Sequence, residues 1–291
     1  MGEEEVVTAA EWVYSLLQDT AVKPERVFQY TSPTGLLGML RSDEVWSTHV
    51  SHLNDFSEFR YTLALLDEHL DEVLQAGGSK SSQVAVKEWK GALRKMPGIA
   101  MFVASFSEES DLLSQWRAYC PAAGGFSLGM HPLELMRSAK CPLIRCEYDV
   151  ARQRTLVAQV TAKLIGDFNA SLAAGRAEAD ARVHSGAAFV SCTFFLATAF
   201  KHPSFAEERE WRLVTRQLPD DAREICFREG RAGVVPYIRL PLGVRAKSIE
   251  EIVIGPTPHP EAALWATRAA AKHLLGRDVP VQVSKIPFRA W

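Results

Sequence analysis

The sequence predicts a single α+β domain spanning residues 1–291, with a mixed or antiparallel central sheet and a helical excursion at about 151–202. Three observations favour this class. Strand-like and helix-like segments follow one another without a steady βαβ rhythm, which argues against a doubly wound parallel sheet. Two late strands, 223–228 and 233–240, are separated by a short connection and could pair as a hairpin. Polar residues follow strands on both sides of the excursion, as expected if one sheet contains them all.

The first half of the chain is predicted to alternate between helices and strands. Residues 3–19 form an amphipathic helix, and its acidic first turn suits the helix dipole. Ser32 as N-cap, with Pro33 at the first helical position, starts the second helix. The other predictions for this half are strands at 27–31, 44–49, 99–106 and 125–130, helices at 33–41, from Asp55 or Ser57 to about Gln75, at 83–95 and at 111–119, and a flexible connection at 77–82.

The second half is dominated by the helical excursion. Residues 151–202 are predicted as two helices with a break near Ala174 and Gly175. The apolar run at about 186–200 contains Ser and Thr and is too short to span a bilayer, so we expect a buried helix. The other predictions are strand regions at 141–149, 209–216, 223–228, 233–240, 250–254 and 279–284, and a helix at 257–276 with Pro260 near its start.

Composition excludes several functional classes. The chain is 47% hydrophobic and 23% charged, as in an ordinary globular protein, and its net charge of −2 does not favour binding to duplex nucleic acid. The first residues lack the positive region and apolar core of a secretion signal, so we expect a cytoplasmic protein without a membrane span. Five cysteines without a Cys-x-x-Cys pair are expected to be reduced. Neither a dinucleotide-binding glycine motif nor a Walker motif is present.

The segment 205–214 carries the densest polar chemistry. Glu208, Glu210 and Arg212 are expected on one face of a strand, and Trp211 and Leu213 on the other. Paired carboxylates beside an arginine shift each other's pKa values, and such groupings cluster at active sites. The structural alternative is a solvated edge strand whose ion pairs each contribute less than about 1 kcal/mol.

Three further polar clusters lie at strand ends. They are Gln29, Tyr30, Thr31 and Ser32; Leu53, Asn54, Asp55 and Glu58; and Ser105 and Ser107 followed by Asp111, Trp116, Tyr119, Gly124 and Gly125. Four polar sets from distant parts of a chain are most simply explained by a shared pocket. We therefore expect all four clusters to converge on one cleft.

The order and spacing of these blocks resemble a bacterial family named only as domain of unknown function 2971. The resemblance covers roughly residues 26–284 and includes the final segment 249–256, although Gln29 stands where the family usually has His. More distantly, the layout resembles the ADP-ribosyltransferase superfamily. That resemblance implies cleavage of the nicotinamide–ribose bond of NAD by Glu210 or Glu208, with ADP-ribose passing to an acceptor that these residues do not identify.

The superfamily resemblance also implies which residues contact the nucleotide. These are Gln29, Tyr30, Thr31, Ser32, Asn54, Asp55, Ser105, Trp116, Tyr119 and Arg212. Breaking the nicotinamide–ribose bond builds positive charge on the sugar, as in glycoside hydrolysis. A carboxylate on the ribose 2′-hydroxyl stabilises that charge most where water is excluded, and an aromatic face can stack on the nicotinamide.

Two alternatives remain open. A metal-dependent hydrolase could use His49, His52, Asp55 and Glu58, which recur every third residue and offer hard or borderline ligands. Asp55 with Glu58 also fits a helix cap and a capping-box-like pattern, so no metal is favoured. The other alternative is a non-enzymatic sensor or interaction module, in which the large aromatics are core residues and the glycines shape turns.

Overall fold

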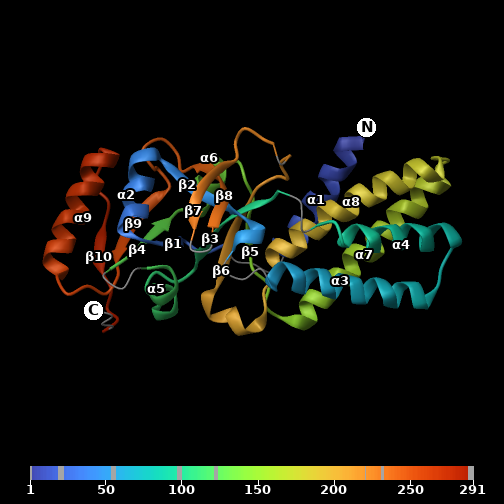
Figure 1. The fold of residues 1–291 in the computed structure, drawn as a ribbon, viewed down its shortest axis with the longest axis horizontal. Helices are drawn as coiled ribbons and strands as arrows, with labels where there is room; N and C mark the ends of the chain where they lie inside the picture. The colour runs from blue at the N-terminus through green and yellow to red at the C-terminus, as the bar shows by residue number, and fades with distance from the viewer. Residues whose placement is uncertain are drawn as a thin grey trace.

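The computed structural model describes residues 2–18, 23–53, 57–96, 100–120, 124–219, 221–230 and 233–287. The molecule is elongated, with a mixed sheet at one end and a helical bundle at the other (Figure 1). The strands are β1 Val27–Thr31, β2 Glu44–His49, β3 Phe102–Ser107, β4 Phe126–Met130, β5 Leu143–Arg145, β6 Glu210–Val214, β7 Cys226–Gly230, β8 Gly233–Pro241, β9 Ile249–Ile254 and β10 Val281–Val283. The helices are α1 Gly2–Gln18, α2 Pro33–Ser42, α3 Ser57–Ala76, α4 Lys80–Leu93, α5 Leu113–Tyr119, α6 Pro132–Ala139, α7 Val150–Ala173, α8 Glu178–Ala199 and α9 Pro260–Leu275, with short 3₁₀ helices η1 Val50–His52 and η3 Pro203–Glu208.

One ten-stranded sheet contains strands from both sides of the helical excursion. Its order is β10-β9-β4-β1-β3-β2-β8-β7, and β6 lies between β3 and β5. The β9–β10 pair is parallel and the other strand pairs are antiparallel. The α+β class and mixed sheet predicted from the sequence are confirmed, as is the hairpin, which pairs Gly230 with Gly233.

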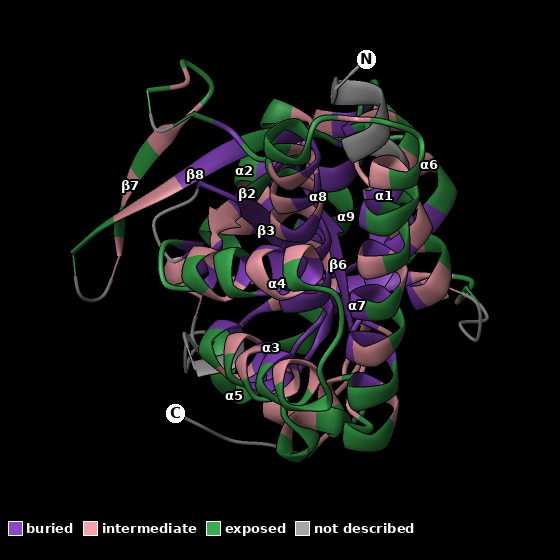
Figure 2. Ribbon diagram, turned by 90° about the vertical axis from the view of Figure 1, so that its right-hand side faces the viewer, coloured by how far each residue is buried: buried purple, intermediate pink, exposed green. Residues whose placement is uncertain are grey.

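The two faces of the sheet pack into different cores. Helices α2, α6 and α9 cover one face, where Phe102 and Trp211 are buried. The bundle of α1, α3, α4, α7 and α8 packs over part of the other face, against Val103 and Val214. Because successive side chains on a strand point to opposite faces, β3 and β6 contribute to both cores. The buried colouring in Figure 2 accordingly runs from the bundle into β3 and β6.

The bundle is organised around α8, which packs against α1, α3, α4 and α7. Trp89 of α4 stacks on Phe189 of α8 with ring centroids 5.3 Å apart. The break between α7 and α8 falls at Gly175, where φ is +85°, as the sequence predicted. Among the described residues, none of the helices has the length and apolar character needed to cross a bilayer.

The clearest differences from the sequence-based expectation concern four elements. Helix α4 begins at Lys80, inside the predicted connection, because the Ser79 hydroxyl accepts a hydrogen bond from the Ser82 amide. Helix α6 was not predicted, although Pro132 occupies its first turn; the expected 141–149 strand is reduced to β5. Strand β6 starts at Glu210, because Arg209 has a left-handed backbone that ends the preceding η3 turn.

Candidate functional site

Strand β6 is an interior strand, and every one of its residues is buried. It pairs with β3 on one side and with β5 on the other. The solvated edge strand considered from the sequence is therefore wrong. Glu210 and Arg212 lie on the face toward the helical bundle, and Trp211 and Leu213 lie in the opposite core, as the alternation predicted.

A buried ion cluster joins β6 to the end of the helical excursion. The Lys201 ammonium lies 2.6 Å from a Glu208 oxygen and 2.5 Å from Glu210 Oε2. Arg212 Nε donates to Glu210 Oε1 at 2.8 Å, and its Nη1 donates to the Thr198 carbonyl in the last turn of α8 at 3.0 Å. The two carboxylates and the two cations named here compensate each other's charge, which matters because an uncompensated buried charge is costly. Lys201 was not among the site residues expected from the sequence.

Glu210 is held in its ionised form by this cluster. Burial alone would raise the pKa of its carboxyl, but the charges of Arg212 and Lys201 outweigh burial and lower the pKa to about 2. A general acid or base works best with a pKa near the operating pH. Glu210 is therefore suited to fixing charge and structure rather than to transferring a proton near neutrality.

Tyr30 lies on the same face of the sheet as Glu210. Phe28 pairs with Ser107 and Ser107 pairs with Glu210, so Tyr30, two residues from Phe28, points the same way. The Tyr30 hydroxyl donates to the Glu109 carbonyl at 2.8 Å.

Ser107 continues this connection toward the ion cluster. Its hydroxyl accepts from the Glu109 amide at 3.1 Å and donates to the Glu208 carbonyl at 2.8 Å. Hydrogen bonds and ion pairs thus link the polar groups of three of the four sequence clusters, from Tyr30 through Ser107 and Glu208 to Lys201 and Glu210.

Trp116 and Tyr30 form a packed pair rather than an exposed aromatic platform. Their rings meet edge to face with centroids 4.6 Å apart, and both side chains are buried. Trp116 Nε1 donates to Asp111, which also accepts hydrogen bonds from the Ser284 hydroxyl and the Lys285 amide. Burial raises the pKa of the Tyr30 hydroxyl. Stacking of nicotinamide on Trp116 would require this packing to open.

Two glycines, Gly125 and Gly255, allow close packing beside Tyr30 and Trp116. A Cβ on Gly255 would lie 3.0 Å from the Trp116 ring, and a Cβ on Gly125 would overlap the Cys120 side chain. The Gly255 amide donates to the Gly125 carbonyl at 2.9 Å. A side chain at Gly125 would therefore force Cys120 to move, and one at Gly255 would press on the Trp116 ring, so both glycines let α5 pack closely against the end of the sheet.

The other nucleotide-contact candidates are divided between locations. Ser32 caps α2 through its hydroxyl. Gln29 and Thr31 alternate to the face opposite Tyr30, and among the described residues Gln29 Oε1 is buried without a hydrogen-bond partner. Ser105 pairs with Arg212 on the cluster's face, and Tyr119 on α5 is 40% exposed. Asn54 and Asp55 lie outside the described residues.

Of the four residues proposed as metal ligands, the structure describes the side chains of two, His49 and His52. The Nδ1 atom of His49 accepts a hydrogen bond from the Ser51 amide at 3.1 Å, and the His49 and His52 rings lie 5.6 Å apart. Asp55 and the side chain of Glu58 fall outside the described part of the chain. Within that part, histidines, cysteines and acidic residues do not gather in threes with the geometry to hold an ion.

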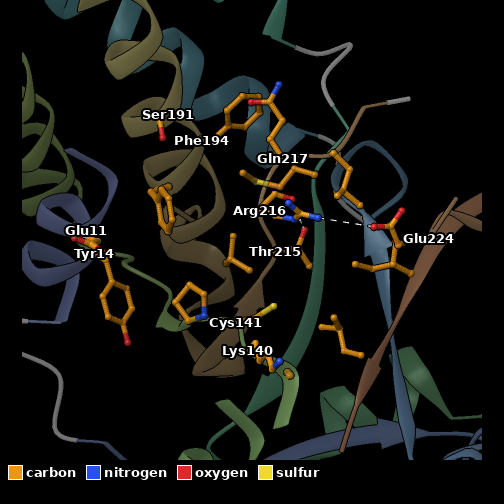
Figure 3. A pocket seen from close by; sticks show the side chains of 18 of the residues that line it. Glu11, Tyr14, Lys140, Cys141, Ser191, Phe194, Thr215, Arg216, Gln217 and Glu224 are labelled. Atoms are coloured by element: carbon orange, nitrogen blue, oxygen red, sulfur yellow. Dashed lines mark hydrogen bonds and ion pairs between the residues drawn. The ribbon is translucent and has the colours of Figure 1, made fainter. Parts of the chain in front are cut away.

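A cavity of about 670 Å³ lies between the bundle and the sheet (Figure 3), and the residues of the ion cluster are not among its lining residues. Its walls come from α1, α8, β8, the end of β6 and the turn after α6. None of the sequence-predicted site residues that the structure describes lines it. This cavity was not predicted from the sequence, because its lining residues come from several short segments far apart in the chain.

Comparison with known proteins found a matching family model for part of the chain. Neither the curated proteins nor the solved structures gave a match. Residues 115–213 match the model of a family described as protein of unknown function (DUF2971). The matched stretch begins in α5 and ends in β6, so it contains Trp116 and the whole ion cluster. Over residues 115–213, the chain is similar to the DUF2971 family.

Proposed function

We propose that the protein cleaves the nicotinamide–ribose bond of NAD at the polar face of its sheet, with Glu208 as the carboxylate that stabilises the sugar cation. One observation carries the proposal. The linked groups from Tyr30 to Glu210 lie on one face, and Glu208 is the carboxylate of the ion cluster that reaches solvent. Its side chain is 21% exposed, against 7% for Glu210.

The same geometry favours Glu208 over Glu210 as the reacting group. Both oxygens of Glu210 contact buried cations and its side chain is almost fully buried, so a ribose hydroxyl reaches Glu210 less readily than Glu208. Glu208 is held by Lys201 through Oε2 and by its own carbonyl through Ser107. A carboxylate fixed in advance stabilises developing positive charge without reorganising during the reaction.

Helix α5 supplies the aromatic group in this proposal. The Ser114 hydroxyl donates to Glu207 at 3.2 Å, which places α5 beside the η3 turn that carries Glu208. Tyr119, on the same helix, is more exposed than Trp116 and can stack on a nicotinamide ring. Gln29 has no part in this arrangement, because it lies on the opposite face of the sheet from Tyr30. Water is the simplest acceptor for the ADP-ribose.

The test compares Glu208→Gln with Glu207→Gln, a neighbouring exposed glutamate whose amide replacement can still accept the Ser114 hydrogen bond. Release of nicotinamide from NAD is followed for the wild type and both variants, with thermal melting alongside. Loss of a charge-stabilising group is expected to lower kcat by about 10²–10³-fold in Glu208→Gln, while Glu207→Gln keeps its activity. A wild type that shows no NAD binding by calorimetry, or an active Glu208→Gln protein, would reject the proposal.

A second candidate is a non-enzymatic sensor or interaction module. The observation that favours it is the full pairing of Glu210 with Lys201 and Arg212, which is what a cluster that fastens α8 to the sheet requires. For this candidate, the calorimetric titration with NAD shows no heat of binding. The same titration therefore separates the two candidates before any kinetic assay.

A further inference from the structure

The cavity lies at the junction of the two hydrophobic cores. Phe194 and Val214 reach it from the bundle core, and Ile238 and Leu240 reach it from the core under α2, α6 and α9. Ligand sites favour such junctions, and a volume of about 670 Å³ lies within the range of small-molecule sites. Figure 3 shows the labelled polar side chains distributed around this space.

The charged side chains on the lining carry more positive than negative groups. The cations are Lys140, Arg216 and Arg239, and the anions are Glu11 and Glu224. Arg216 and Glu224 lie 3.8 Å apart with side chains 82% and 59% exposed, so their ion pair is solvated and weak. An incoming anion can therefore replace Glu224 as the ionic partner of Arg216 with little loss of free energy.

The walls below this rim are apolar. Phe194, Phe195, Val214 and Ile238 offer ring and branched aliphatic surface. Burial raises the pKa of the Cys141 thiol to about 11, so it remains protonated near neutral pH and behaves as a small apolar group. The space thus combines an apolar interior with a rim that has a cation excess.

We propose that this cavity binds an amphipathic small molecule with an apolar body and an anionic end, of the kind represented by a medium-chain carboxylate. The body packs between Phe194 and Ile238, and the anionic end lies at the rim beside Arg216 and Lys140. The cavity lining does not include Lys201, Glu208, Glu210 or Arg212, so this proposal does not depend on NAD chemistry.

Dodecanoate and dodecyltrimethylammonium, both below their micelle concentrations, test the proposal by isothermal calorimetry on the full chain. They share an apolar body and differ in the sign of the head group. Wild-type protein is expected to bind dodecanoate and to bind the cationic probe at least about tenfold more weakly. Absence of dodecanoate binding, or equal binding of both probes, would overturn the proposal.

Three variants assign the binding to the cavity. Ser191→Phe fills the space from α8, where Ser and Phe have similar helix propensity, and is expected to weaken dodecanoate binding by at least about tenfold. Arg216→Gln removes the rim charge and is expected to weaken it about two- to fivefold. Arg223→Gln is the matched control, because Arg223 is exposed and lies outside the lining. Unchanged binding in Ser191→Phe would place the ligand elsewhere and overturn the proposal.

A second readout keeps the test decisive if Ser191→Phe folds poorly. Cys141 lines the cavity and Cys226 does not, while both are free and half-buried. Dodecanoate is expected to slow alkylation of Cys141 by N-ethylmaleimide in the wild type, as followed by peptide mass spectrometry. Cys226 should react at an unchanged rate. Equal protection of both cysteines, or of neither, would contradict binding in the cavity.

Discussion

At the scale of single residues, Glu210 shows how one sequence signal can support two roles. Two glutamates and an arginine within five residues indicated a site that tunes carboxylate pKa values, and the pKa of Glu210 is indeed shifted. The shift is downward, because Lys201 and Arg212 hold the buried carboxylate ionised. Removing one partner of a buried ion cluster costs far more than the intact cluster contributes, because the remaining buried charges lose an opposite charge that compensated them.

Glu210→Gln is therefore expected to be strongly destabilising. Gln keeps the shape but leaves Arg212 and Lys201 without the carboxylate between them, which predicts a loss of about 3–5 kcal/mol in unfolding free energy. Urea denaturation monitored by circular dichroism measures the change. Glu207→Gln serves as the exposed control and should unfold within about 0.5 kcal/mol of the wild type. A Glu210→Gln protein as stable as this control would show that the cluster is not structural.

The same carboxyl predicts how stability depends on pH. The folded pKa of about 2 lies below the ordinary glutamate value of 4.5, so ionised Glu210 stabilises the fold above pH 4.5, and this contribution disappears as pH falls toward 2. The shift corresponds to about 3 kcal/mol. The stability difference between wild type and Glu210→Gln should therefore shrink through this window. A difference that stayed constant from pH 6 to pH 3 would contradict the lowered pKa.

At the scale of elements, local signals predicted boundaries better than burial. Ser32 and Pro33 correctly started α2, because capping depends on adjacent residues alone. Pro132 is an equivalent local signal for α6, but the helix that it starts has only eight residues and so shows little helical periodicity in the sequence. The burial of β6 could not be predicted, because it depends on α8 delivering Lys201 and the Thr198 carbonyl to the charged face.

In the candidate site, too, local pattern predicted some features, and contacts with distant segments determine the others. Strand alternation and pairing bring Tyr30 and Glu210 to one face, as the expected convergence of their blocks requires. Because side chains alternate along β1, Gln29 lies on the other face. The prediction that Gln29 and Tyr30 contact one nucleotide did not take this alternation into account. The partners Tyr148, which accepts a hydrogen bond from the Glu210 amide, and Lys201 come from outside the four blocks. Local pattern carries no information about such partners.

The docking of α5 gives a prediction at this scale. Gly125→Ala places a methyl group against Cys120 and should destabilise the protein by about 1–3 kcal/mol through overpacking. Gly38→Ala in α2 is the matched control, because nothing lies within 4 Å of its added Cβ and Ala favours helix. It should stabilise by a few tenths to about 1 kcal/mol. Thermal melting of both variants checks the pair; a neutral Gly125→Ala would remove the packing explanation for this glycine.

At the scale of the whole molecule, the sheet and the bundle are joined by shared strands and by one buried polar seam. Gln153 of α7 is fully buried, and its Nε2 donates to the carbonyls of Glu147 and Lys201 at 2.6 and 2.9 Å. Its Oε1 accepts from the Tyr61 hydroxyl of α3 at 2.7 Å. The amide thus ties two bundle helices to the segment that delivers Lys201 to β6.

This seam predicts that the bundle and the sheet unfold together. Val103 and Val214 pack in the bundle core, while their neighbours in the same strands pack in the other core. Opening the bundle would therefore expose one face of β3 and β6 to solvent. Hydrogen exchange read by mass spectrometry should therefore give similar opening free energies for peptides from α7 and β4 in the wild type.

A variant at the seam tests this coupling. Gln153→Met removes the hydrogen-bond donor to the buried carbonyls of Glu147 and Lys201, and it should make the amides of α7 exchange well before those of β4. Gln282→Met, at an exposed position in β10, is the matched control and should leave the two peptides together. If wild-type α7 already opened far below β4, the bundle would be a separate cooperative unit, and the single domain expected from the sequence would be wrong.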